Sequence, residues 1–333
     1  MKRVHTSKKI KSSRVDKKSE PVDDDIFTDD ADLLSVKNKR KPKSFLIIGS
    51  KLFKRSTINE LISESKNYFE TVLFVTVDKV QLQTVDEQVG LYYKGKNLLD
   101  FDVIYPRISS RDYSIGEAVM KAIESSSAYC PVSLRGYQVS NHKYHTSQLL
   151  HNAGMPSVAT ALSISPKYAE QSIDEIKFPM VLKLISGFAG KGVMLVNDSK
   201  QLVSLLDTVH MFEQVICMQE FIKGKNSDIR CYVTGNKVIA VKRTGRRGDW
   251  RANISRGGYA ELVEVTPEMK RIALTSSRLL GMDICSVDLM QTSNGFVIIE
   301  VNFMPGPFIK FLGTLIIKEW ARFIFNKASE SSE

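Results

Sequence analysis

The sequence predicts a protein of mixed α/β and α+β fold class, with an α/β lobe followed by a region of strands, hairpins and helices. Three observations support this prediction. A β-α-β pattern begins at Phe45, hairpin patterns dominate the second half of the chain, and a charged segment without apolar periodicity precedes both. With 333 residues, 43% of them hydrophobic, the chain is long enough to bury a core that is divided among such lobes.

The first 43 residues differ in composition from the rest of the chain. They hold thirteen Lys or Arg and eight Asp or Glu residues, which accounts for half of the formal net charge of +10. The charges come in blocks and the apolar residues are sparse, so residues 1–43 are expected to form a disordered tail. A solvated tail and an arm that contacts a polyanion are both compatible with this composition. Residues 327–333 are expected to form a short disordered C-terminus.

Targeting signals and cysteine spacing bear on where the protein acts. No stretch approaches the roughly 20 apolar residues that a membrane helix needs, and the basic start lacks the apolar segment of a signal peptide. The four cysteines are scattered, without the spacing of a zinc site or a disulfide scaffold. The sequence therefore favours a cytoplasmic protein with no membrane partner.

The lobe expected over residues 44–133 has α/β character. Residues 45–48 form an apolar run that ends at a glycine, as a buried parallel strand does before a loop. A helical pattern follows, and residues 72–77 predict a second buried strand. Residues 101–106 then predict another strand and residues 116–125 another helix.

The pattern changes over residues 134–326, where the expected lobe boundaries are 134–212 and 213–326. The predicted elements are helices at 141–153, 202–209, 267–280 and 316–325, strands at 181–185, 193–196 and 216–222, and hairpins at 229–241 and 286–302. No internal repeat is visible.

A glycine-rich loop follows the predicted strand that contains Lys183. Gly187, Gly190 and Gly192 permit positive φ and let backbone N–H groups approach an anion closely, and a nearby ammonium neutralises the anion's charge. The loop leads into a strand, and Lys191 is not followed by Ser or Thr, so the pattern is not a P-loop. It suits a triphosphate, although a flexible hairpin turn with an exposed lysine fits equally well.

The strand that ends in Glu220, Phe221 and Ile222 stops at a polar loop. Backbone groups at such a strand end can bond to the edge of an adenine, and Asp228 further along can accept hydrogen bonds from ribose hydroxyls. Edge strands with an acidic residue are common, so this segment taken alone favours a structural role.

The strongest pattern lies near the C-terminus. Asp288, Glu300 and Asn302 carry oxygen ligands on two apolar strands, where unpaired carboxylates are costly to bury. Mg²⁺ prefers such hard oxygen ligands, with substrate phosphates and waters completing its octahedron. The sequence therefore predicts a magnesium site, with a pair of solvated strand carboxylates as the alternative.

The length of the turn between these two strands decides whether the site can form. A two-residue turn at residues 294–295 would place Asp288 on the face opposite Glu300. A three-residue turn at residues 293–295 sets Asp288 directly opposite Glu300. We predict the three-residue turn, with Asn302 on the same face.

Arginines are concentrated in the loop that follows the predicted hairpin at residues 229–241. They are Arg243, Arg246, Arg247, Arg251 and Arg256, together with Arg230 in the hairpin itself. Guanidinium groups bind phosphates and carboxylates through paired N–H donors and stabilise charge that develops during group transfer. Nucleic acid is bound by the same residue type, but only Trp250 and Tyr259 are interleaved here, which disfavours a stacking platform for single strands.

Taken in order, these motifs resemble the RimK branch of the ATP-grasp superfamily. The residues that carry the resemblance are Lys183, the glycine loop, Gln219-Glu220, Asp228-Ile-Arg230, residues 248–253 and 256–258, Asp288, and Glu300-Val-Asn302. The similarity covers about residues 45–325. It implies the ATP-grasp fold, in which a pre-ATP-grasp α/β lobe precedes two α+β lobes whose antiparallel sheets enclose ATP.

The resemblance also implies a role for each matching residue. Lys143, Lys183 and the three loop glycines are expected to contact the ATP phosphates, the backbone of Glu220, Phe221 and Ile222 the adenine, Asp228 the ribose, and Arg251 and Asn253 the phosphate side. Arg230, Arg251 and Arg256 are expected to be catalytic. Asp288, Glu300 and Asn302 are expected to hold two Mg²⁺ ions, with Mn²⁺ as an alternative metal.

By this resemblance the chain is expected to be an ATP-dependent ligase that works through an acyl phosphate. The expected partners are ATP, a carboxylate acceptor on a protein or small molecule, and an amino-acid amine such as that of glutamate, and the chain is compatible with a homo-oligomer. Where the family commonly has Ala-Ser-Pro-Gly after the metal-binding asparagine, this chain has bulky Phe303, Met304 and Phe308. These side chains are expected to reshape the acceptor pocket.

Two other functions are compatible with the sequence. The aromatic run at residues 303–308 is similar to that of ATP-grasp inositol-phosphate kinases, so a kinase acting on a polyanionic hydroxyl substrate is the first alternative. A non-catalytic module that binds ATP or a polyanion is the second.

Overall fold

The computed structural model describes residues 44–51, 55–171, 176–184, 192–211, 215–224, 226–248, 250–252, 254 and 257–330. The tail at residues 1–43 and the last residues, 331–333, lie outside the described residues. So do four of the expected site residues: Gly187, Gly190, Asn253 and Arg256.

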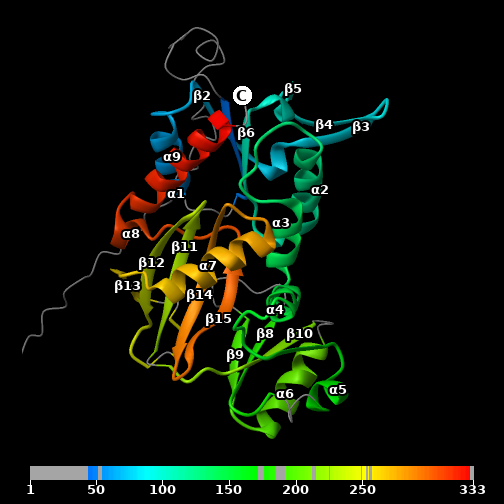
Figure 1. Cartoon of the computed structure of the whole chain (residues 1–333). Helices are drawn as coiled ribbons and strands as arrows, with labels where there is room; N and C mark the ends of the chain where they lie inside the picture. The colour runs from blue at the N-terminus through cyan, green and yellow to red at the C-terminus, as the bar shows by residue number, and fades with distance from the viewer. Residues whose placement is uncertain are drawn as a thin grey trace, which may run out of the picture. The chain divides into compact units, whose positions relative to one another are not determined.

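The first lobe confirms the predicted β-α-β arrangement. Its parallel sheet has the strand order β2-β1-β6, and the elements are β1 (Ser44–Gly49), α1 (Arg55–Ser65), β2 (Thr71–Thr76), β6 (Val103–Arg107) and α2 (Tyr113–Glu124). A small antiparallel sheet was not predicted. It consists of β3 (Gln81–Val85), β4 (Gln88–Tyr93) and β5 (Lys96–Asn97), which extend from this lobe in Figure 1.

The helix predicted at residues 141–153 is confirmed, and a second helix, which was not predicted, directly precedes it. α3 (Leu134–Asn141) ends and α4 (Lys143–Asn152) begins at His142, whose extended backbone separates them. The His142 side chain caps α4 by accepting a hydrogen bond from the backbone N–H of His145. Sequence periodicity alone does not reveal this break, because an N-cap histidine is unusual.

The second lobe is built on a four-stranded antiparallel sheet with the order β7-β10-β8-β9. Its elements are β7 (Thr160–Ser163), α5 (Pro166–Glu170), β8 (Met180–Leu184), β9 (Val193–Val196), α6 (Ser199–His210) and β10 (Ile216–Glu220). Because β10 pairs with both β7 and β8, the expected lobe boundary at residue 212 is wrong, and the second lobe extends to Glu220.

The third lobe contains a five-stranded antiparallel sheet with the order β13-β12-β11-β14-β15. Its strands are β11 (Ser227–Thr234), β12 (Lys237–Thr244), β13 (Tyr259–Val263), β14 (Ile284–Thr292) and β15 (Gly295–Asn302). Helix α7 (Pro267–Leu280) crosses one face of this sheet, as Figure 1 shows. Its bounds match the prediction because local signals set them: Thr266 caps the N-terminus and Gly281, at φ 67°, ends the helix.

The turn between β14 and β15 differs from the prediction. It has two residues, Ser293 and Asn294, and pairs Thr292 with Gly295. The predicted pairing of Asp288 with Glu300 is nevertheless present, because the register shifts between Asp288 and Leu289. The predicted turn length was therefore wrong, whereas the predicted pairing is confirmed.

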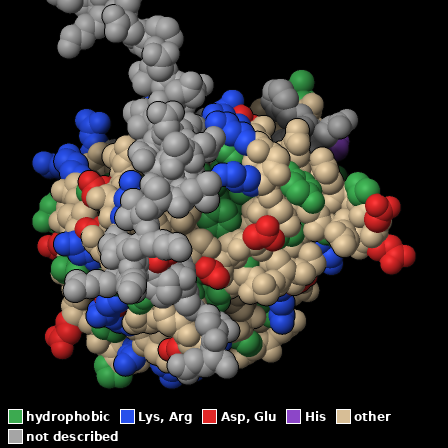
Figure 2. Space-filling model, turned by 90° about the horizontal axis from the view of Figure 1, so that it is seen from above, with side chains coloured by type: hydrophobic (Ala, Val, Ile, Leu, Met, Phe, Trp, Pro, Cys, Tyr) green, Lys and Arg blue, Asp and Glu red, His purple; other side chains and the backbone are tan. Residues whose placement is uncertain are grey.

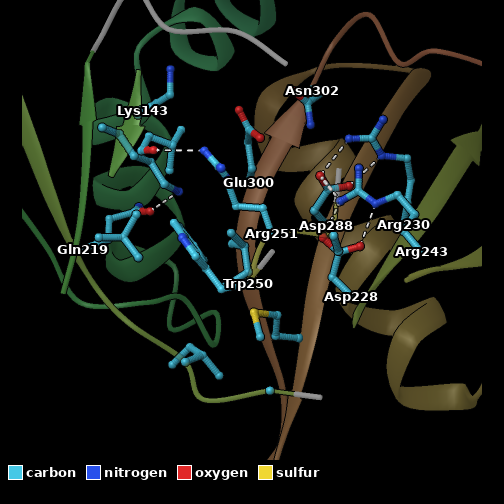
Figure 3. A pocket seen from close by; sticks show the side chains of 18 of the residues that line it. Lys143, Gln219, Asp228, Arg230, Arg243, Trp250, Arg251, Asp288, Glu300 and Asn302 are labelled. Atoms are coloured by element: carbon cyan, nitrogen blue, oxygen red, sulfur yellow. Dashed lines mark hydrogen bonds and ion pairs between the residues drawn. The ribbon is translucent and has the colours of Figure 1, made fainter. Parts of the chain in front are cut away.

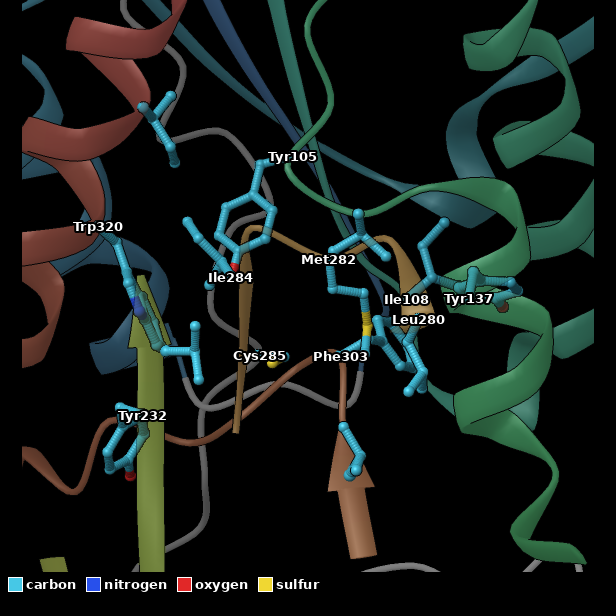
Figure 4. Packing of buried hydrophobic residues seen from close by; sticks show 14 of the residues in the cluster. Tyr105, Ile108, Tyr137, Tyr232, Leu280, Met282, Ile284, Cys285, Phe303 and Trp320 are labelled. Atoms are coloured by element: carbon cyan, nitrogen blue, oxygen red, sulfur yellow. The ribbon is translucent and has the colours of Figure 1, made fainter. Parts of the chain in front are cut away.

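Two hydrophobic cores underlie the three sheets. One core is continuous through the first and third lobes, and the second lobe packs around a separate core that includes Leu182, Leu202 and Met218. Figure 4 shows the larger core, in which Tyr105, Tyr232 and Trp320 are labelled. The first and third lobes thus form one packing unit and the second lobe another.

The C-terminal helix ties the chain end to the first lobe. α9 (Leu315–Glu330) packs against α1, and Phe325 contacts Phe69 edge to face with ring centroids 5.5 Å apart. A short helix, α8 (Ile309–Leu312), precedes it. The expectation of disorder from residue 327 is wrong up to Glu330, because the buried side of α9, including Ala328, continues the helical packing.

The surface shown in Figure 2 carries Lys and Arg side chains intermixed with Asp and Glu. On this face the charge is therefore not gathered into one basic surface of the kind that nucleic acid favours. No helix in the described parts of the chain is both long and apolar enough to span a membrane.

Candidate active site

A cavity of about 750 Å³ lies between the second and third lobes, within the size range of small-molecule sites. Most of the predicted site residues that the structure describes line it. They are Lys143, Lys183, Glu220, Phe221, Ile222, Asp228, Arg230, Arg251, Asp288, Glu300 and Asn302. Residues from separate parts of the sequence therefore converge on one space, as the resemblance implied.

Lys183 is held at the second-lobe side of the cavity by a hydrogen-bonded chain. Its buried ammonium donates to Oε1 of Gln219, whose Nε2 donates to Oγ1 of Thr160 over 3.0 Å. Burial lowers the pKa of Lys183, and the nearby Glu300 carboxylate opposes that shift. An anion bound at this place would offset the free-energy cost of burying the ammonium. Sequence analysis did not identify Gln219 as its partner.

A loop from the third lobe reaches across to the second lobe. Nη1 of Arg251 donates to the carbonyl oxygen of Val193 over 3.4 Å, and its guanidinium lies 5.5 Å from the centre of the Trp250 ring. Trp250 in turn contacts Phe221 edge to face, with centroids 5.8 Å apart. The contact between Phe221 and Trp250 joins the end of β10 to the loop that carries Arg251. Both aromatic residues line the cavity and provide an apolar surface for a planar base.

Four charged side chains form a buried network on β11, β12 and β14, seen at the right of Figure 3. Arg230 binds Asp288 with two hydrogen bonds, Nε to Oδ1 at 2.8 Å and Nη2 to Oδ2 at 2.7 Å. Arg243 binds Asp228 through Nε and Nη2 at 2.6 and 2.5 Å and also donates to Asp288 at 2.8 Å. The two arginines therefore neutralise both carboxylates.

This network corrects two expectations. Arg243 was assigned to a basic loop, but it lies on β12 and is only 4% exposed. The carboxylate of Asp288 was expected to need a metal ion to offset its burial, yet two guanidinium groups already do so. Burial by itself raises the pKa of Asp288, but Arg230 and Arg243 outweigh it and lower that pKa to about 2.

Glu300 and Asn302 have no such partners among the described residues. They lie on the same face of β15 because they are two residues apart, and Asp288 and Ser286 lie opposite them on β14. Nδ2 of Asn302 and Oγ of Ser286 are buried without a hydrogen-bond partner in the described structure. A donor such as Nδ2 would be satisfied by an acceptor oxygen, and Oδ1 is the atom of Asn302 that could ligate a cation.

The donor chemistry at this place fits a divalent cation bound together with phosphate. No group of three or more His, Cys, Asp or Glu side chains converges within the described residues. The expected set instead has two carboxylates and one amide, and one carboxylate is shared with arginines. Such a site is incomplete by itself, and Mg²⁺ bound at few protein ligands takes substrate phosphates and waters as the others.

The wall of the cavity beyond β15 is uncharged. It includes Ser109 and Ser110 of the first lobe, Asn141, Met304 and Pro305. Phe303 was expected to reshape this wall, but most of its side chain is in the core, where it contacts Tyr137 edge to face at 5.0 Å (Figure 4). Phe308, also expected here, is not among the described residues that line the cavity. Of the three bulky residues, Met304 is the one that shapes this wall without being buried in the core.

Several residues of the cavity were missed by the sequence analysis. Ser109 and Ser110 follow β6 in the first lobe, and Met290 and Ile299 come from the β14–β15 hairpin. Serines in a loop and apolar residues in a strand are ordinary in any sequence, so no local signal distinguishes them. Only the folding together of the lobes brings them to the site.

Comparisons with known proteins agree with this arrangement. Residues 140–323 match the family of the RimK-like ATP-grasp domain. A protein of Maridesulfovibrio salexigens named probable alpha-L-glutamate ligase is 39% identical over 220 residues, which is 65% of this chain and 73% of that protein.

Two solved structures of ATP-grasp-type ligases share the fold. One is the macrocyclase MdnC of Microcystis aeruginosa, bound to its precursor peptide MdnA, with a TM-score of 0.65 and 17% identity, covering 85% of this chain and 99% of that one. The other is the D-alanine–D-alanine ligase of Bacillus anthracis in complex with ATP, with a TM-score of 0.64 and 18% identity, covering 86% of this chain and 98% of that one. The chain belongs to the RimK-like ATP-grasp family of ATP-dependent ligases.

Proposed function

We propose that this ligase joins an amino-acid amine, such as that of glutamate, to a carboxyl group on a protein or small molecule through an acyl phosphate. The name of the Maridesulfovibrio relative supports glutamate as the amino acid. The observation that carries the proposal is the convergence of Lys183, Arg230 and Glu300 on one cavity, which is large enough for a nucleotide and a second substrate.

The reaction has two steps. An oxygen of the acceptor carboxylate attacks the γ-phosphorus of ATP, the bond to the β-phosphate oxygen breaks, and an acyl phosphate and ADP are formed. The amine then attacks the acyl carbon, phosphate leaves with the bonding electrons, and the amine loses a proton as the amide forms. Lys143 and Lys183 offset the charge of the phosphates, and Arg230 stabilises the oxyanion that develops at the acyl carbon.

Glu300 and Asn302, with Asp288 opposite, are the residues that would hold Mg²⁺, and two ions, with Mn²⁺ as a substitute, are expected. When bound, the metal screens the negative charge of the phosphates. Because Asp288 is already paired with two arginines, Glu300 is the carboxylate whose charge remains available to such an ion.

The remaining residues position the nucleotide and exclude water. Trp250 and Phe221 cover the base, and Asp228 borders the ribose. Arg251 links the second and third lobes beside the base. Holding both reactants in one cavity can lower a barrier by roughly 7–11 kcal/mol, and excluding water protects the acyl phosphate from hydrolysis.

The decisive experiment measures the release of ADP and of free phosphate. Amino acids and carboxylate acceptors are screened in combination with MgATP. A ligase releases both products only when the carboxylate and the amine are present together. ADP with a phosphorylated product and no free phosphate would instead show the kinase alternative, and nucleotide binding without turnover in any combination would show a binding module.

Glu300→Gln provides the matched test of the proposed metal site. It keeps the shape of the side chain, removes the charge, and leaves the Arg230 and Arg243 network in place, so a fall in kcat of roughly 100-fold or more is expected with little change in Tm. Glu261→Gln makes the same change on the exposed edge strand β13 and should leave kcat unaltered. Equal activity of the two variants would remove Glu300 from the mechanism.

A further inference from the structure

The segment that follows β15 is held by contacts from three parts of the chain. Nη2 of the buried Arg107 donates to the carbonyl oxygen of Pro305 over 3.0 Å. The hydroxyl of Tyr232 donates to the carbonyl oxygen of Gly306. Phe303 anchors the beginning of the segment in the core. These contacts fix the backbone that leads to Phe308.

Phe308 has an unusual backbone conformation. It precedes α8 with φ 51° and ψ 44°, in the left-handed region that bulky residues rarely adopt. Such a conformation persists only where the surroundings impose it, and it is concentrated at functional positions. A glycine would adopt this backbone conformation without strain. The presence of phenylalanine therefore suggests that its side chain has a role.

The guanidinium of Arg230 lies over the ring of Phe308. The guanidinium carbon of Arg230 lies 5.5 Å from the ring centre, which is within the range of a cation–π contact. Tyr232 supports the same ring edge to face, with centroids 6.1 Å apart and an interplanar angle of 82°. Arg230 lines the cavity, whereas Phe308 is absent from the described residues that line it. The ring therefore backs the guanidinium from outside the site.

Two contacts of Arg230 come from different directions. Asp288 binds one edge of the guanidinium through Nε and Nη2. The Phe308 ring contacts the guanidinium from a second side, where it restricts motion about that edge. Arg230 is therefore held by Asp288 and by Phe308 together.

We propose that Phe308 is a positioning residue that holds the guanidinium of Arg230 in the orientation needed to stabilise charge in the reaction. The proposal rests on the proposed function of Arg230, and it places the bulky side chain of Phe308 behind a site arginine instead of in the acceptor pocket.

The test compares Phe308→Leu, which removes the ring, with Phe308→Tyr, which keeps it. The expected result for Phe308→Leu is a fall in kcat of about tenfold with KM for ATP nearly unchanged, while Phe308→Tyr retains most of the wild-type kcat. Phe311→Leu is the matched control. Phe311 lies on α8, where its ring contacts Tyr259 at 5.3 Å and not Arg230.

Phe308→Gly separates positioning from folding. It removes the ring and also relieves the positive φ, so its Tm should fall less than that of Phe308→Leu while kcat falls by a similar factor. A loss of kcat in proportion to the loss of Tm across the three variants would mean that Phe308 is only structural, and would overturn the proposal.

A measurement that needs no turnover tests the contact between Phe308 and Arg230 independently of the ligase activity. The Nε–H signal of Arg230, assigned by its absence in Arg230→Lys, should shift and exchange faster with water in Phe308→Leu but not in Phe308→Tyr or Phe311→Leu. An unshifted signal in Phe308→Leu would refute the contact whatever the enzyme's activity. A shifted signal in a protein that shows no ligation with any substrate would support the contact and reject the proposed function instead.

Discussion

Asp288 on β14 lies directly opposite Glu300 on β15 because a β-bulge takes up one residue between them. With a two-residue turn, regular pairing would set Ile299 opposite Asp288. Instead Leu289 pairs with Ile298, Asp288 pairs with Glu300, and Ile299 is left unpaired. Glu300 and Asn302 consequently face the cavity, and Val301 and Phe303 face the core.

Loss of the Asp288 charge should destabilise the fold. Asp288→Asn leaves Arg230 and Arg243 buried against a neutral partner, and breaking a buried ion pair typically costs about 3–5 kcal/mol. Urea unfolding should therefore show a drop of about 3 kcal/mol in the free energy of unfolding. Glu300→Gln makes the same chemical change across the hairpin and should cost less than about 1 kcal/mol, since no described residue is paired with it. Equal losses in the two variants would contradict this account of the network.

Trp250 should report nucleotide binding. The chain has two tryptophans, of which Trp320 is fully buried in the core and Trp250 lines the cavity against Phe221. Titration with MgATP should give a saturable change in tryptophan fluorescence that persists in Trp320→Phe and disappears in Trp250→Phe. A response that survives in Trp250→Phe would place the nucleotide elsewhere.

Gly245 should be sensitive to a single added methyl group. A Cβ at this position would lie 2.2 Å from the carbonyl oxygen of Arg251 and 2.4 Å from Oδ1 of Asn226. Gly245→Ala must therefore displace the loop that carries Trp250 and Arg251. Displacing a positioning residue by about 1 Å can lower the rate of a reaction up to 100-fold. We therefore expect kcat/KM for ATP to fall by roughly 10- to 100-fold in steady-state assays.

The control for this change is Gly306→Ala, where the added Cβ meets no atom within 4 Å. It should leave kcat/KM for ATP within about twofold of the wild type. Comparable losses at both glycines would show that steric displacement of the loop is not the cause.

His142 should make stability depend on pH. Its side chain caps α4 by accepting from the N–H of His145 and stacks on that ring, with centroids 3.8 Å apart. Burial and the neighbouring His145 lower the pKa of His142 below its ordinary value of 6.5. The unfolded chain therefore binds a proton at higher pH than the folded chain. The contribution of His142 to the free energy of unfolding is complete above pH 6.5. It is lost as the pH falls through the lower pKa of the folded state.

Two substitutions at His142 separate charge from capping. His142→Asn keeps a good N-cap acceptor that does not titrate, so the fall in Tm between pH 7 and 5 should become smaller than in the wild type. His142→Ala removes the cap at every pH and should cost about 1 kcal/mol already at pH 7. An unchanged pH dependence in His142→Asn would assign the effect to other groups.

Local signals account for the elements that the sequence predicted well. The bounds of α7 follow from a threonine cap and a terminal glycine, and the β11–β12 hairpin follows from apolar runs around Gly235 and Asn236. Glu300 and Asn302 were predicted as metal ligands because oxygen-bearing side chains stand on an apolar strand, and Lys183 was predicted because a glycine-rich loop follows it. Each of these inferences depends on residues that are close together in the sequence.

The sequence by itself determined which side chains are the candidates for the chemistry, because charged and oxygen-bearing residues within apolar strands are visible in the order of the residues. Only the tertiary structure decided how those side chains are paired. Arg243 lies on the same sheet as Asp288 but 45 residues away, and the bulge at Ile299 depends on the competition between a tight turn and a buried face. The Arg243–Asp288 pairing is set by contact between strands that are far apart in the sequence, and the bulge is set by the burial of one face of the β14–β15 hairpin. No local pattern encodes either outcome.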